Sequence, residues 1–146
     1  MNISGEAAIV GIGETEYFRG AKQTVPELVL SASMEAIHDA GLQPTDIDAV
    51  IPPPGYLSAE EIAANLGIPE MRYATEVRMG GASPTASLQS AVMALSAGIA
   101  TNVLITFGWN GYSAFRRRPD TAPSRRKGDP GPVSYTHLTL PTKRIV

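Results

Sequence analysis

The stretch RMGGASPT at residues 78–85 joins two predicted elements and decides how this part of the chain folds. Before it, residues 73–77 alternate in polarity as a strand does. After it, residues 85–97 are rich in Ala and Ser and predict a helix, which Gly98 ends. The first turn of a helix collects unpaired N–H groups and a partial positive charge, which favour a thiolate or a developing oxyanion. The junction is therefore a candidate anion-binding corner.

The elements around this corner follow one another as strand, helix, strand, helix, strand, helix and strand. The predicted helices begin at Thr24 and Ser58, each with Glu three residues later as in a capping box, and at Thr85. The short apolar runs that predict buried strands are residues 7–13, 47–51, 73–77 and 101–108. This alternation predicts an α/β fold, a mostly parallel layered sheet with helices covering it.

Composition sets broad limits on the protein. Its 146 residues, 43% hydrophobic and 18% charged, are typical of one globular domain. The chain contains no cysteine, which excludes disulfides, Cys-ligated zinc and a Cys nucleophile and fits a reducing compartment. No apolar run approaches membrane-spanning length and no secretory signal pattern opens the chain, so we expect a cytoplasmic protein without membrane contact.

Charge is distributed unevenly along the chain. Residues 1–115 carry 4 Lys and Arg against 12 Asp and Glu, whereas residues 116–129 carry 6 against 2. Residues 113–131 are rich in Arg, Pro and Gly and predict a loop. Its Arg116, Arg117 and Arg118 are candidates for binding the phosphates of a ligand such as coenzyme A, and a solvated loop is an equal alternative. The acidic preceding domain argues against nucleic acid.

The C-terminal tail has an unusual sequence. Residues 133–142 read VSYTHLTLPT, which resembles the translation of a transposase sequencing adapter, and residues 143–146 would continue it. We therefore expect residues 132–146 to be a non-native tail on a protein cut near Gly131. A natural Thr-rich β-tail is the less favoured alternative.

Several residues at first sight resemble catalytic or cofactor motifs. Residues 11–16, GIGETE, start like a dinucleotide fingerprint but have Glu16 in place of the third glycine, so a turn that ends a strand is favoured. His38 is predicted on the polar face of its helix, and no Ser-His-Asp relay can be assembled. Ser83 is the only hydroxyl right at the corner, where helix capping is its favoured role over nucleophile. No metal site is predicted.

Taken together, the order and spacing of these motifs over residues 6–112 resemble the N-terminal part of the thiolase superfamily. Residues 7–13, 24–41 and 46–50 resemble its start. Residues 80–83 with the helix and strand that follow them, up to residue 105, resemble its nucleophile helix and next strand. The nearest branch is that of sterol-carrier-protein-type thiolases, bacterial lipid-transfer proteins and acetyl-CoA acetyltransferase-like proteins.

In that superfamily a catalytic cysteine opens the long helix, and its position corresponds to Gly81 here. The resemblance implies chemistry on an acyl-CoA thioester as substrate, with no cofactor, by a lipid or steroid acyltransferase or carbon–carbon lyase. Gly80, Ala82 and Gly81 would then polarise the thioester carbonyl. Cysteine-free relatives include lyases that act on steroid side chains with an OB-fold partner. The family's other catalytic residues lie in a second half, so this fragment is expected to be inactive alone.

The resemblance also implies how the chain assembles. Members dimerise through the strand before the nucleophile helix, here residues 71–77, whose edge would otherwise be exposed. We expect residues 1–112 to form an incomplete thiolase-like domain. Two functions stay open at this point: an enzyme fragment, or a subunit that binds acyl-CoA or a partner without catalysis. A nucleotide-binding α/β domain is a weaker third.

Overall fold

The centre of the protein is a three-stranded parallel sheet. The computed structural model describes residues 5–17 and 22–111. Strands β1 (Ala49–Ile51), β2 (Tyr73–Ala74) and β3 (Val103–Ile105) lie in the order β2-β1-β3, and Ala49 is in register with both Tyr73 and Val103. Such a sheet needs crossover connections, and each one here contains a helix.

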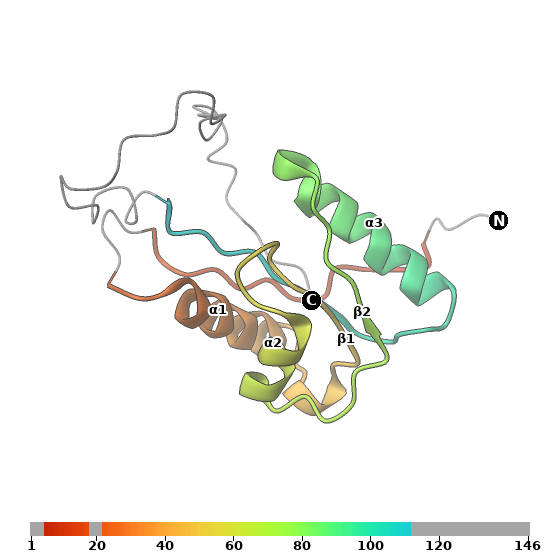
Figure 1. The fold of residues 1–146 in the computed structure, drawn as a ribbon. Coiled ribbons are helices and arrows are strands. Elements are labelled where there is room, and N and C mark those ends of the chain that lie inside the picture. The colour runs from red at the N-terminus through yellow and green to blue at the C-terminus, as the bar shows by residue number, and fades with distance from the viewer. Residues whose placement is uncertain (1–4, 18–21, 112–146) are drawn as a thin grey trace.

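Helices cover both faces of the sheet. Helices α1 (Val25–Asp39) and α2 (Ala59–Leu66) lie on one side and α3 (Ser83–Ser96) on the other (Figure 1). Two short 3-10 helices, η1 (Pro44–Asp46) and η2 (Gly80–Ala82), complete the described elements. The prediction of an α/β fold with a parallel, helix-covered sheet is confirmed.

The core is divided by the alternation of side chains along the strands. Val50 and Leu104 pack toward α1 and α2 and are fully buried. The residues on either side of them pack toward α3, together with Ala91 and Ala94: these are Ala49, Ile51, Val103 and Ile105. Because both faces are covered, the strands are apolar throughout, as in other parallel sheets.

Asp48 fixes the starts of two strands relative to each other. Its carboxylate accepts hydrogen bonds from the backbone N–H groups of Thr101 and Asn102, each at 2.9 Å. Arg72 lies 3.8 Å from the same carboxylate and donates its backbone N–H to the Asp48 carbonyl. One side chain therefore joins the residues that precede β1, β2 and β3.

Both predicted capping boxes are present. At α1 the Thr24 hydroxyl accepts from the Glu27 N–H at 3.4 Å, and the Glu27 carboxylate accepts from the Thr24 N–H at 2.7 Å. At α2, Ser58 and Glu61 make the same reciprocal pair at 3.2 and 2.8 Å. Helix α2 ends at Gly67, whose φ of 79° closes the left-handed cap.

The capping box of α1 predicts a pH-dependent stability. Hydrogen bonds from the Thr24 backbone N–H, and then from its hydroxyl, lower the pKa of Glu27. A carboxylate with a lowered folded-state pKa stabilises the fold above its unfolded pKa, and this contribution is lost as the pH falls through the folded value. We expect Glu27→Gln to lower the melting temperature near pH 7, with a difference that shrinks toward about pH 3. Thermal unfolding followed by circular dichroism measures it, and a pH-independent difference would contradict it.

The predicted buried strand at residues 7–13 is wrong. Residues 7–10 are extended but form no strand, and Ile9 and Val10 are 55% and 52% exposed. The segment lies instead against α1, where a Cβ on Gly11 would lie 2.3 Å from the Ala36 carbonyl oxygen. The Ile12 N–H donates to the Asp39 carboxylate at 2.8 Å. Close backbone packing on a helix replaces the sheet pairing that the apolar run predicted.

Candidate functional site at the start of helix α3

The carboxyl ends of the strands meet at one edge of the sheet, because all three strands run parallel. Ligands of open parallel sheets bind outside this edge. The segments that follow β1 and β2 are joined there by Glu76, whose carboxylate accepts from the Gly55 N–H at 2.9 Å and from Arg78 Nε at 2.6 Å. The start of α3 comes directly after these residues.

The predicted corner is a 3-10 turn that runs into α3. Gly80 has a φ of 56°, a left-handed value that suits glycine, and reverses the chain into η2. The Ala82 N–H donates to the Met79 carbonyl at 3.1 Å, and the Ser83 N–H donates to the Gly80 carbonyl. The amides of Gly80 and Gly81 have no acceptor within the part of the chain that the structure describes. The corner therefore offers two free N–H donors at the positive end of α3.

Ser83 has a different role from the one predicted. It is the first residue of α3, whose N-cap is Ala82, so the prediction that Ser83 itself caps the helix is wrong. Its buried hydroxyl accepts the Met79 N–H at 2.8 Å, which ties the residue before η2 to the first turn of α3. The physical reason is that η2 adds one turn before α3. The backbone N–H groups without an acceptor therefore belong to Gly80 and Gly81, which precede Ser83.

Other candidate residues are not brought to the corner. His38 is exposed in the last turn of α1, which covers the opposite face of the sheet from α3. Arg116, Arg117 and Arg118 lie outside the described residues. Sequence reasoning missed Arg78, an exposed cation in the segment that leads into the two glycines. Its position two residues before Gly80 was the available signal.

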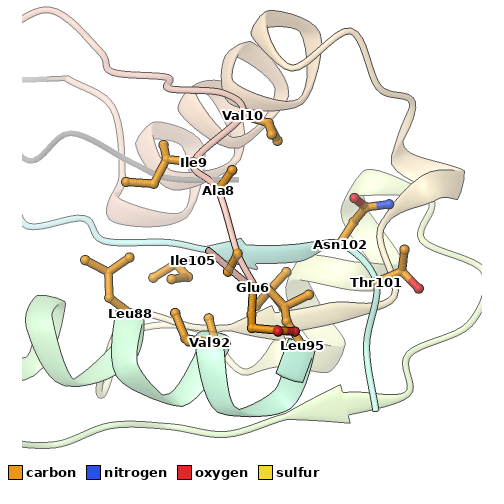
Figure 2. Close-up of a pocket in the computed structure, with 13 residues that line it drawn as sticks. Glu6, Ala8, Ile9, Val10, Leu88, Val92, Leu95, Thr101, Asn102 and Ile105 are labelled. Carbon is orange, nitrogen blue, oxygen red and sulfur yellow. The ribbon is translucent and has the colours of Figure 1, made fainter. Parts of the chain in front are cut away.

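Two hollows of the described structure lie elsewhere. One of about 490 Å³ lies between residues 6–10, α3 and β3 (Figure 2), and one of about 400 Å³ lies at the amino ends of the strands, beside Asp48 and Arg72. Neither contains residues 80–83, and Gly80, Gly81 and Ala82 are exposed. Within residues 5–17 and 22–111, no cluster of three His, Asp or Glu residues could hold a metal, and no helix could cross a membrane.

Comparison with solved structures relates this arrangement to known proteins. The structure named "Ltp2-ChsH2(DUF35) aldolase" superposes with a TM-score of 0.70 at 34% identity, over 73% of this chain and 28% of that one. The 3-oxoacyl-[acyl-carrier-protein] synthase III of Aquifex aeolicus has a TM-score of 0.53 at 23% identity, over 64% of this chain and 32% of that one. The chain has a thiolase-like fold.

Curated relatives of this thiolase-like chain include an aldolase, a lyase and a beta-ketoacyl-[acyl-carrier-protein] synthase III of Streptomyces avermitilis, which is 36% identical over 66% of this chain and 32% of that protein. A steroid side-chain-cleaving aldolase of Thermomonospora curvata is 36% identical over 115 residues, 78% of this chain and 29% of that protein. A 17-hydroxy-3-oxo-4-pregnene-20-carboxyl-CoA lyase of Mycobacterium tuberculosis is 34% identical over 151 aligned residues, 98% of this chain and 39% of that protein. No family model matches.

These coverages show that the thiolase-like chain corresponds to one part of each longer relative. It spans about a third of the length of the curated relatives it matches. The lyase of M. tuberculosis matches 98% of this chain, so that match extends into residues 132–146, and their adapter origin stays a prediction. The relationship to enzymes of lipid and steroid CoA metabolism rests on these matches.

Proposed function

We propose that this thiolase-like chain is the N-terminal part of a carbon–carbon lyase that cleaves the side chain of a steroid or related lipid held as an acyl-CoA. The observation that carries the proposal is 34–36% identity to two proteins named for this kind of reaction. Residues 1–112 would be the incomplete thiolase-like domain of that enzyme. The acyltransferase reaction is disfavoured because the chain has no cysteine to carry an acyl group.

The corner suits a retro-aldol cleavage. In such a reaction a base removes the proton of a β-hydroxyl, the carbon–carbon bond breaks to leave a ketone, and the electron pair passes to the acyl-CoA as an enolate. Protonation of the enolate at its α-carbon, which returns the proton taken by the base, then gives the shortened acyl-CoA. Negative charge then develops on the thioester oxygen, where fixed N–H donors stabilise it. The free amides of Gly80 and Gly81 are suitable donors, whereas the predicted donor at Ala82 already donates its N–H to the Met79 carbonyl. No covalent bond to the protein is needed, which fits glycine at position 81.

Partners of this part of the protein are inferred from the same comparison. The solved aldolase is named as an Ltp2-ChsH2(DUF35) assembly, so we expect a DUF35-type partner with an OB-fold. A second copy is expected at residues 71–77, because β2 is an edge strand whose outward backbone groups would otherwise be unpaired. Arg116, Arg117 and Arg118 would contact the phosphates of coenzyme A.

A non-catalytic subunit that binds acyl-CoA is the second candidate. It is favoured by the combination of Gly81 at the position of the family nucleophile and an exposed His38 on the far face of the sheet. The two candidates differ in turnover alone, since both predict affinity for coenzyme A thioesters.

The deciding experiment uses the complete gene product together with its DUF35 partner. We expect it to cleave a 17-hydroxy-steroid side-chain acyl-CoA into a ketosteroid and a shortened acyl-CoA, detected by mass spectrometry, and residues 1–131 alone to be inactive. Coenzyme A binding without turnover on any acyl-CoA would support the binding subunit. Thiolysis of a 3-ketoacyl-CoA as the main activity would contradict the lyase.

A further inference from the structure

Each of the three strands is followed by an exposed large apolar side chain at the carboxyl edge of the sheet. Tyr56 follows β1 and is 48% exposed, Met79 follows β2 and is 61% exposed, and Trp109 follows β3 and is 71% exposed. Because the strands run parallel, these residues leave the sheet at the same edge as the corner at Gly81. We call these three side chains the apolar rim, and their shared exposure is typical of a binding surface.

Two parts of the apolar rim are joined to each other by hydrogen bonds. The Glu76 carboxylate accepts from the Gly55 N–H at 2.9 Å and from Arg78 Nε at 2.6 Å. Gly55 directly precedes Tyr56, and Arg78 directly precedes Met79. The apolar rim is therefore fixed on this side relative to η2, which begins directly after Met79.

The third part of the apolar rim, Trp109, is held by close backbone packing. The segment that follows β3 runs along α1 (Figure 1), where a Cβ on Gly108 would lie 2.4 Å from Val29 Cγ2. A Cβ on Gly111 would lie 2.1 Å from Cε2 and Cζ2 of Trp109, so the indole packs against the backbone of residue 111. Most of the ring surface remains open to solvent. A rigid aromatic ring gives a large contact area and loses little conformational entropy on binding.

We propose that the indole of Trp109 binds the fused rings of the steroid while the corner at Gly81 holds the thioester. This inference rests on the proposed function, because it places the lipid part of that acyl-CoA. The corner follows β2 and Trp109 follows β3, with β1 between them, so their strands are two spacings or about 10 Å apart. A four-ring nucleus spans a distance of this order, and its flat apolar face matches an indole.

The adenine of coenzyme A is the other flat group in such a substrate. It lies at the far end of the pantetheine arm, which in its extended form carries it well beyond two strand spacings. The steroid rings are much closer, because the hydroxyl-bearing carbon of the breaking bond is itself a ring atom. Contact between the rings and the indole also removes apolar surface of both from water. The steroid nucleus is therefore the better occupant beside Trp109.

A comparison of two substrates tests this placement in the complete gene product with its DUF35 partner. One is a 17-hydroxy-steroid side-chain acyl-CoA, and the other is 3-hydroxy-2,3-dimethylbutanoyl-CoA, which has the same breaking bond and no rings. We expect Trp109→Ala to lower kcat/KM for the steroid substrate by about tenfold or more, and for the small substrate by less than about twofold. Trp109→Phe keeps a flat apolar ring and should retain most of the steroid activity. Equal losses on both substrates, or no loss on either, would overturn the proposal.

Binding of the rings without turnover separates this inference from the proposed function. The probe is androst-4-ene-3,17-dione, a ketosteroid without coenzyme A, and isothermal titration calorimetry gives its Kd in the same complex. We expect Trp109→Ala to raise this Kd about tenfold and Trp109→Phe to change it less than about threefold. Ile99→Ala, which precedes β3 at the opposite edge and is 43% exposed, is the control and should leave it unchanged.

Two results of this titration would count against the placement. An unchanged Kd for the ketosteroid in Trp109→Ala would overturn it, even if the complete protein is an active lyase. Weaker binding of coenzyme A by Trp109→Ala, with binding of the ketosteroid unaffected, would overturn it in favour of the adenine. Ketosteroid binding that depends on Trp109 in a protein without lyase activity would support the placement and contradict the proposed reaction alone.

Discussion

The complete protein carrying Gly81→Pro is expected to lose about 100- to 1,000-fold in kcat for side-chain cleavage. Proline removes the N–H of residue 81, which has no acceptor in the described structure and is proposed to stabilise the enolate oxygen. Loss of one oxyanion donor costs about 3–4 kcal/mol of transition-state stabilisation in other enzymes. The first turn of a helix tolerates proline because its N–H groups have no partner within the helix, so the fold should survive.

The matched control for this variant is Gly81→Ala. The φ of Gly81 is not positive, so alanine fits the backbone and retains the N–H. We expect Gly81→Ala to keep a kcat close to that of the unmodified protein, with circular dichroism confirming the fold of both variants. If Gly81→Pro folds and retains full kcat, the corner is not an oxyanion site.

Replacement of Gly13 by alanine is expected to destabilise the protein by about 3 kcal/mol. A Cβ at this position would lie 2.0 Å from the Ala32 oxygen and 2.4 Å from the Ala36 nitrogen. Both atoms belong to the backbone of α1 and cannot turn away, so the segment must separate from the helix. Urea unfolding measures the loss of free energy.

The control for Gly13→Ala is Ile12→Ala in the same segment. The Ile12 side chain is 39% exposed, and its backbone bond to Asp39 does not need the side chain. We expect a loss of less than about 1 kcal/mol for this substitution. Equal stability of Gly13→Ala and the unmodified protein would show that segment 7–13 does not pack on α1 in solution.

Local signals explain why much of the fold could be predicted. The capping boxes at Thr24 and Ser58 depend on side chains three residues apart, and both are present. The strands at β1 and β3 combine β-branched runs with flanking turn residues, and both are found, shorter than predicted. These features depend only on residues that are close together in the sequence, so the sequence is sufficient to predict them.

Features that depend on distant partners were not predictable in the same way. The run at residues 7–13 has the pattern of a buried strand, yet its two glycines fit the backbone of α1, more than 15 residues later. The turn between β2 and α3 was predicted at the right place, because two glycines before a helix are a local signal, and its binding of an anion stays a prediction. The hydroxyl of Ser83 was assigned wrongly because η2, a turn of only three residues, has no sequence signal of its own.

The pKa of a thiol placed at the corner tests the central claim most directly. In this cysteine-free chain, Gly81→Cys puts one thiol at the positive end of α3, and Ala97→Cys puts one at its C-cap. From the pH dependence of alkylation by iodoacetamide, we expect the thiol at position 81 to have a pKa about one unit below the ordinary value of about 8.5. The thiol at position 97 should lie at or above that value. Equal pKa values at the two positions would contradict an electropositive corner of free amides at Gly81.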